Sequence, residues 1–102
     1  MTRVVISPRA ETDLEDIWLT IALENPLAAT RLARAIGERI ESLAAHPRLG
    51  PRRSEIRPAT RVLVEGAYLI LYETNPDTDD EAIDFVEIVR VVDGRRDLTA
   101  LV

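Results

Sequence analysis

The stretch that decides the fold reads Thr60-Arg-Val-Leu-Val-Glu65, Gly66, Ala67-Tyr-Leu-Ile-Leu-Tyr-Glu-Thr74. Its two apolar runs are rich in β-branched and aromatic residues, and the short break at Gly66 is typical of a tight β-hairpin. Asn75-Pro-Asp-Thr-Asp-Asp80 must end the second run, because proline has no N–H to donate to a neighbouring strand. A third run from about Ile83 to Val92 ends at Asp93-Gly94. The stretch therefore predicts three neighbouring antiparallel strands.

The first half of the chain predicts a cover for one face of this sheet. Arg3-Val-Val-Ile6 is a short β-prone run, and Ser7-Pro8 and Asn25-Pro26 each pair a helix-capping residue with a proline suited to the first helical turn. Two amphipathic helices in a hairpin follow, and the second ends by His46-Pro47. Their apolar stripes have the 3.6-residue period of a helix that packs on one side: Ala10, Leu14, Ile17, Trp18 and Ile21, then Ala29, Leu32, Ile36, Ile40 and Leu43.

These elements predict an α+β fold in the order β-α-α-β-β-β. An antiparallel sheet is covered by the N-terminal helical hairpin, because a sheet with one apolar face is stable only when another layer buries that face. The segment from Pro47 to Pro58 is too rich in proline and glycine to be regular, so we expect a crossing loop. A chain of 102 residues has the length of one domain, which we assign to residues 1–102.

The composition narrows the chemistry available to the chain. There is no cysteine and only one histidine, His46, so the sequence offers no thiolate or histidine metal site and predicts neither a metal nor a cofactor. His46 precedes a proline and is interpreted as a residue at the end of a helix. No apolar run has the length of a signal peptide core or a membrane span, so we expect a cytoplasmic protein without a membrane partner.

Charge is distributed unevenly along the chain. The net charge of −5 argues against non-specific binding of nucleic acid by the whole molecule. Residues 48–61 nevertheless carry five arginines against one glutamate, and this basic segment separates acidic segments at residues 10–25 and 73–87. All thirteen cationic side chains are arginines. Base composition of the gene explains that bias more simply than selection for recognition of anions.

Several residues that often carry chemistry have simpler interpretations here. Trp18 lies on an apolar stripe and is expected in or near the core. Tyr68 and Tyr72 share one face of a strand with Ile70, so they are expected to pack beneath the helices rather than form a reactive surface beside Arg61 or Arg90. Three carboxylates, Asp13, Glu15 and Asp16, are explained by their position near the start of a helix, where negative charge is favourable.

The arginines are the strongest functional candidates. Arg61 opens a strand, Arg90 lies late in another, and Arg95 and Arg96 follow Gly94. If these side chains converge beside the basic loop, they suit recognition of phosphate or carboxylate groups. The alternative, pairing with the acidic helices and the acidic turn, is equally open.

Five separated motifs, taken together, resemble the ParE branch of the RelE/ParE toxins, found among plasmid stabilisation systems. They are Ile6-Ser-Pro-Arg-Ala-Glu-Thr-Asp-Leu-Glu-Asp-Ile17, Asn25-Pro26, His46-Pro-Arg-Leu-Gly50, Tyr68-Leu-Ile-Leu-Tyr72 and Ile88-Val-Arg-Val-Val-Asp-Gly-Arg-Arg-Asp-Leu98. The resemblance spans essentially the whole chain. It implies the toxin of a type II toxin–antitoxin system, with the β-α-α-β-β-β topology, neutralised by a cognate ParD-like antitoxin that wraps the toxin. Operator DNA is then a partner only indirectly, through the antitoxin.

The superfamily resembled here divides into ribosome-dependent mRNA endonucleases like RelE and toxins like ParE, which inhibit DNA gyrase by binding and cause growth arrest. RNA cleavage needs cations at the phosphate and groups that move protons. The RelE pattern supplies lysines on the first strand of the hairpin, an arginine just after the tyrosine of the next strand, an arginine after the late glycine, and a tyrosine near the C-terminus. This chain has no lysine, Leu69 follows Tyr68, and Thr99-Ala-Leu-Val102 holds no tyrosine. Only Arg96 keeps its place, so no catalytic residue is assigned.

Three functions therefore stay open at this point. The first is a gyrase inhibitor of the ParE kind, with Arg90, Arg95 and Arg96 as the gyrase-binding candidates. The second is an mRNA endonuclease that uses Arg61, Arg90 and Arg96 instead of the missing set. The third is a non-toxic member that only binds its antitoxin and serves in autoregulation. For the antitoxin we expect an amphipathic segment on apolar surface of the hairpin and sheet, with these binding candidates: Arg52, Arg53, Arg57, Arg61 and Trp18.

Overall fold

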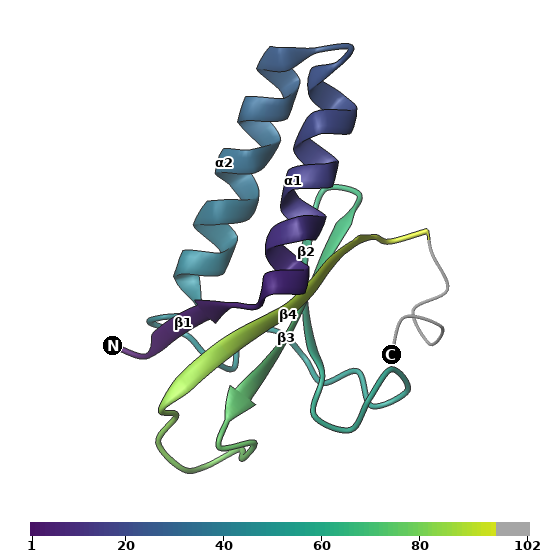
Figure 1. The fold of residues 1–102 in the computed structure, drawn as a ribbon. Helices are drawn as coiled ribbons and strands as arrows, with labels where there is room; N and C mark the ends of the chain where they lie inside the picture. The colour runs from purple at the N-terminus through teal and green to yellow at the C-terminus, as the bar shows by residue number, and fades with distance from the viewer. Residues whose placement is uncertain (96–102) are drawn as a thin grey trace.

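Two antiparallel helices form the N-terminal layer of the computed structural model, which describes residues 1–95 (Figure 1). Helix α1 spans Pro8–Ala22 and α2 spans Pro26–Ser42. Each begins at the predicted cap: Ser7 Oγ accepts a hydrogen bond from the Ala10 N–H, and Asn25 Oδ1 accepts one from the Ala28 N–H, both at 3.1 Å. Because a short turn joins them, the helices must run in opposite directions.

The second layer is a four-stranded sheet in the order β1-β4-β3-β2. Its strands are β1 (Arg3–Ile6), β2 (Arg61–Glu65), β3 (Tyr68–Asn75) and β4 (Phe85–Asp93). The predicted α+β order is confirmed, but the sheet is mixed rather than wholly antiparallel. Strand β1 runs parallel to β4, with Ile6 opposite Ile88. The helices between β1 and the rest of the chain provide the long crossover that a parallel pair requires.

The β2–β3 hairpin closes through the two-residue loop Gly66-Ala67, since Glu65 lies opposite Tyr68. Gly66 has a φ of +59°, a conformation that glycine adopts without the steric cost met by other residues. Farther along, the register of β3 against β4 shifts between Leu71 and Tyr72, as in a β-bulge. Strand β4 begins two residues after the expected Ile83.

The main core lies between the helices and the sheet. Most members of the predicted helical stripes face it, and a smaller apolar cluster on the other face of the sheet is covered by Ile56 from the crossing loop. The buried main-core residues are Ala10, Ile36, Ile40, Leu43, Leu63, Ile70, Tyr72, Val86, Ile88 and Val91. The second cluster consists of Ile56, Val62, Leu71 and Val92. Both faces of the central strands are therefore buried.

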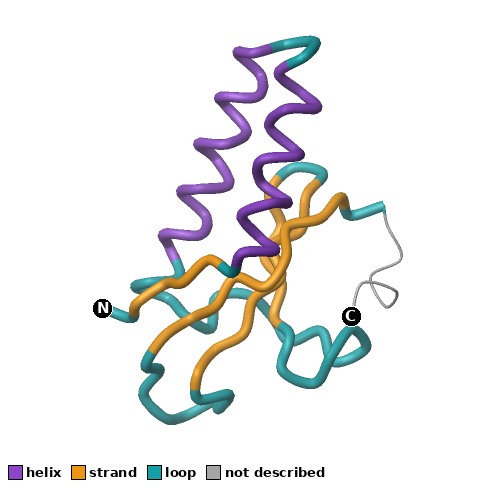
Figure 2. Tube along the Cα trace, viewed as in Figure 1, coloured by secondary structure: helices purple, strands orange, loops and turns teal. Residues whose placement is uncertain are grey.

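The closed end of the helical hairpin projects beyond the sheet (Figures 1 and 2). The molecule accordingly measures 44 × 30 × 21 Å along its principal axes. Leu19, Leu23 and Leu27 at this end are exposed. Among the described residues no helix has the length and apolar character needed to cross a membrane.

Candidate functional site

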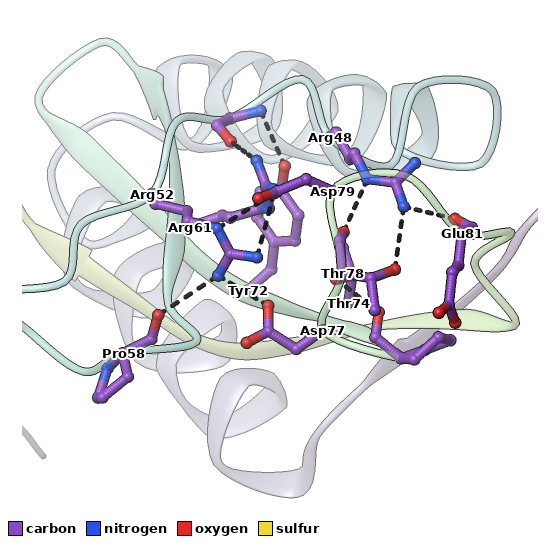
Figure 3. A network of polar contacts seen from close by, with 12 residues as sticks. Arg48, Arg52, Pro58, Arg61, Tyr72, Thr74, Asp77, Thr78, Asp79 and Glu81 are labelled. Atoms are coloured by element: carbon purple, nitrogen blue, oxygen red, sulfur yellow. Dashed lines mark hydrogen bonds and ion pairs between the residues drawn. The ribbon is translucent and has the colours of Figure 1, made fainter.

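Arginines of the crossing loop and of β2 bind the acidic turn between β3 and β4 (Figure 3). Arg52 contacts the carboxylates of Asp77 at 2.8 Å and Asp79 at 3.2 Å. Arg61 donates from Nη2 to the same Asp79 carboxylate at 2.9 Å. Arg48 donates from Nε to the Thr78 carbonyl oxygen at 2.9 Å. We call these three arginines the loop clamp, because together they hold the turn against the crossing loop.

Tyr72 lies at the centre of this network and is fully buried. Its hydroxyl oxygen accepts a hydrogen bond from the Gly50 N–H at 2.8 Å, while the Gly50 carbonyl oxygen accepts one from Arg61 Nη1 at 3.0 Å. A Cβ at Gly50 would lie 2.6 Å from the Val62 carbonyl oxygen, so only glycine fits. Burial raises the pKa of Tyr72. The predicted packing of this tyrosine is confirmed, and its hydroxyl is enclosed rather than at the rim.

Arg90 forms a buried ion pair with Asp13 of α1. Its Nε and Nη2 donate to the two carboxylate oxygens at 2.8 and 3.0 Å, and the Val91 N–H donates to one of them at 3.0 Å. The carboxylate raises the pKa of Arg90. Asp13 is 9% exposed and Arg90 is 8% exposed. The explanation of Asp13 by its position near the start of the helix is therefore insufficient, because the buried side chain fixes α1 to β4.

The other candidate arginines lie nearer the surface. Arg53 contacts Glu55 at 2.6 Å, and the highly exposed Arg95 contacts Asp93 at 2.7 Å. Arg57 is exposed. Arg96, the third gyrase-binding candidate, lies outside the described residues.

These placements separate the arginines rather than cluster them. Strand β3 lies between β2, which carries Arg61, and β4, which carries Arg90. Arg61 reaches the acidic turn, Arg90 reaches α1, and Arg95 pairs with its own strand end. Of the two alternatives that the sequence left open, Arg61 and Arg90 follow the second, pairing with the acidic turn and with an acidic helix, whereas Arg95 pairs with neither.

Trp18 is 41% exposed, so of the expected positions in or near the core it takes the second, beside residues that pack against the core. It borders an apolar pocket of about 240 Å³ between the helices, which we call the interhelical pocket. The opposing wall on α2 carries Ala29, Ala33 and Gly37, and these small side chains leave the space unfilled. The full lining is Ile6, Leu14, Ile17, Trp18, Ala29, Leu32, Ala33, Ile36, Gly37, Ile40 and Glu41.

The described residues contain no group of three metal-ligating side chains placed to hold an ion. The surface features on which a partner could act are an apolar pocket, exposed apolar residues at the end of the hairpin, and candidate arginines that mostly pair with carboxylates of this chain. Such surfaces suit contact with another protein better than chemistry on a small molecule.

Comparison with known proteins identifies the family. The family model described as the ParE toxin of the type II toxin–antitoxin system parDE matches residues 4–98. Toxin ParE1 of Mycobacterium tuberculosis is 34% identical over 98 residues, which cover 95% of this chain and 94% of that protein. Toxin ParE3 of Caulobacter vibrioides is 33% identical over 104 residues, covering 98% and 94%.

A solved structure described as the chromosomal ParDE TA system from P. aeruginosa shares the fold. Its TM-score is 0.71 at 18% sequence identity, and the match covers 91% of this chain and 96% of that one. The agreement in fold complements the sequence matches, which extend over nearly the whole chain. This chain belongs to the ParE toxin family of type II toxin–antitoxin systems.

Proposed function

We propose that this protein acts in the cytoplasm by binding DNA gyrase and blocking its cycle, and that a cognate ParD-like antitoxin relieves the block. Membership of the ParE family supports the toxin role. The gyrase target comes from the resemblance of the five sequence motifs to the ParE branch. Growth arrest is the expected consequence, because replication needs continued gyrase activity.

The ion pairs of the strand arginines are the main reason to favour binding of gyrase over cleavage of RNA. Stabilising a phosphate that gains charge requires cations directed at it and free to approach it. Arg61 and Arg90 are instead 6% and 8% exposed, and each is bonded to a carboxylate of this chain. An mRNA endonuclease built on them would first have to break the buried Arg90–Asp13 pair and free Arg61 from Asp79, which favours gyrase binding.

The antitoxin is proposed to place an amphipathic helix against the interhelical pocket. The pocket is apolar over most of its lining and about 240 Å³ in volume, enough to receive a few aliphatic side chains. Trp18 at its border offers the large, partly exposed aromatic surface that is common at the centre of protein interfaces. Acidic residues of the antitoxin would meet Arg57 and Arg53, which lie at the surface, before Arg52 and Arg61, which already bind the acidic turn.

Gyrase contact is proposed at the end of β4. Arg95 is the described candidate that a large partner reaches directly, because its side chain is 87% exposed. Its pairing with Asp93 at the surface is weak enough to be exchanged for a partner's carboxylate or phosphate. Arg90 would take part only through its effect on the position of this strand end.

Supercoiling of relaxed plasmid by purified gyrase tests the proposal. The protein should inhibit the reaction, and the antitoxin encoded beside it should restore supercoiling at equimolar amounts. The matched variants are Arg95→Glu, expected to weaken inhibition, and Arg31→Glu on the exposed face of α2, expected to leave it unchanged. Full supercoiling in a large excess of the wild-type protein would reject gyrase as the target. Cleavage of ribosome-bound mRNA would then be assayed with the same preparation.

A further inference from the structure

The outer edge of β2 has one residue whose backbone groups are open. Strand β2 is the last in the sheet, and the two-residue loop makes Glu65 and Tyr68 a hydrogen-bonded pair. Backbone groups alternate in direction along an antiparallel strand, so those of Val62 and Val64 point away from β3. The Val62 N–H is satisfied by the Pro51 carbonyl oxygen at 3.1 Å. Within residues 1–95, the N–H and C=O of Val64 meet no such neighbour.

A hollow of about 270 Å³ lies beside this open edge. Exposed Leu49 and Val64 supply its apolar surface, at 47% and 56% exposure. Arg39 of α2 and Arg53 of the crossing loop contribute the cationic side chains. The remaining lining residues are Pro51, Val62 and Leu63.

Arg39 is the unusual member of this group. Its Nε is buried and has no hydrogen-bond partner in the described part of the chain, where its guanidinium also makes no ion pair. A buried donor without an acceptor is costly, and the unpaired charge of the same side chain would attract an anionic partner. The hollow therefore combines an open strand edge, apolar contact surface and an unmatched positive charge.

We propose that the edge of β2 at Val64 binds an extended segment of the antitoxin that carries a carboxylate. This inference rests on the proposed antitoxin partner and adds a second contact to the interhelical pocket. The segment pairs its backbone with the N–H and C=O of Val64, as peptides do when they extend a sheet. An apolar side chain lies against Leu49 and Val64, and the carboxylate binds Arg39.

Charge complementarity selects this occupant over a second copy of the chain. If two copies paired through β2, each would bring the unpaired charge of Arg39 to the same small area, and like charges would repel. A carboxylate-bearing strand instead supplies the acceptor that Arg39 lacks. Strand pairing between copies is accordingly expected to be absent, and the free protein should not dimerise through this edge.

Replacement of Val64 separates backbone pairing from side-chain packing. Val64→Pro removes the outward N–H and is tolerated at a strand edge, because that N–H takes no part in pairing with β3. Val64→Thr is the matched control, since it keeps the N–H and the β-branched shape. We expect Val64→Pro to weaken antitoxin binding about tenfold relative to Val64→Thr. Equal affinities of two folded variants would overturn the proposal.

Arg39→Gln tests the charge, with Arg34→Gln on the exposed side of the same helix as control. The first should weaken binding about tenfold and make it less sensitive to salt. The second should change neither quantity. If both variants bind with the wild-type affinity and salt dependence, the assignment of the carboxylate to Arg39 is wrong.

Amide hydrogen exchange in the wild-type complex needs no substitution. It therefore tests the proposal even if one of the variants fails to fold. Exchange at Val64, followed by NMR, should slow by at least about tenfold on binding of the antitoxin encoded beside this chain. Unchanged exchange in a complex that does form would overturn the edge contact while leaving the antitoxin proposal intact. Failure of the wild-type protein to bind that antitoxin would instead reject the antitoxin proposal and this inference with it.

Discussion

Asp13 shows how one buried carboxylate joins the two layers of the molecule. It accepts three hydrogen bonds, two from Arg90 and one from the Val91 N–H, across a sequence separation of more than seventy residues. A buried ion pair of this kind contributes little beyond a well-packed apolar pair, but removal of one partner leaves a buried charge without compensation. The pair therefore constrains which strand α1 can pack against.

Asp13→Asn should lower the free energy of unfolding by about 3 kcal/mol, because Arg90 would remain buried without a counter-charge. Urea denaturation followed by circular dichroism measures the change. Asp16→Asn, an exposed change on the same helix, serves as control and should shift the stability by less than about 0.5 kcal/mol. A loss at position 13 no larger than the control's would contradict the assigned role.

The position of Asp13 in the helical pattern indicates that it is buried, although a charged residue usually lies at the surface. Asp13 lies three residues after Ala10 and four before Ile17, on the same apolar stripe that faces the core. A charged residue at a core-facing position of a helix is expected to have a buried partner. The identity of that partner depends on which strand lies beneath α1, and no local pattern contains that information.

At the scale of elements, two glycines in open surroundings should respond to substitution in opposite directions. A Cβ at Gly66 or Gly37 would meet no atom within 4 Å, so packing does not decide the outcome at either position. Gly66 has a positive φ, which costs an alanine about 1 kcal/mol. Gly37 lies inside α2, where alanine favours the helix by up to about 1 kcal/mol.

Thermal unfolding of Gly66→Ala and Gly37→Ala, measured beside the wild-type protein, checks this pair. The first variant should melt at a lower temperature and the second at a higher one. A change of the same sign in both would mean that backbone conformation does not govern these sites.

Most helices and strands could be predicted from local sequence, because residues close to their ends determine where they begin and end. The Ser7-Pro8 and Asn25-Pro26 caps, the glycine turn and the proline at the end of β3 all act within a few residues. The parallel pairing of β1 with β4 escaped prediction, because a four-residue strand can join either edge of a sheet. Of the loop clamp, only the pairing of Arg61 was predicted, as one of two alternatives, and the contacts of Arg48 and Arg52 were not, since opposite charges in sequence do not reveal which will meet.

At the scale of the whole molecule, Trp18 shows where the periodicity of a helix stops being informative. The apolar stripe correctly predicts that Trp18 lies on the side of α1 that faces α2. The residues opposite it, Ala29, Ala33 and Gly37, are too small to bury it. The result is a pocket instead of a filled core. A surface of this kind buries apolar area when a partner binds, which favours association.

Trp18→Ala should weaken antitoxin binding by more than about tenfold, because a large aromatic anchor is lost from the centre of the contact. Leu23→Ala is the matched control: Leu23 is also exposed and apolar, but it does not line the interhelical pocket. Isothermal titration calorimetry measures both affinities, and circular dichroism verifies the fold. Equal losses of affinity in the two variants would indicate that the antitoxin contacts the end of the hairpin rather than the interhelical pocket.

The position of β4 also has a consequence for the nascent chain. Of the strands in residues 1–95, β4 is the last to be synthesised, yet it lies between β1 and β3. While the ribosome still encloses residues 85–93, the β2–β3 hairpin has one open side, β1 has no strand to pair with, and Asp13 lacks its buried partner Arg90. Long-range pairing of this kind completes late in folding. The native surfaces thus form only after translation has passed the final strand, so a prematurely terminated polypeptide would lack them.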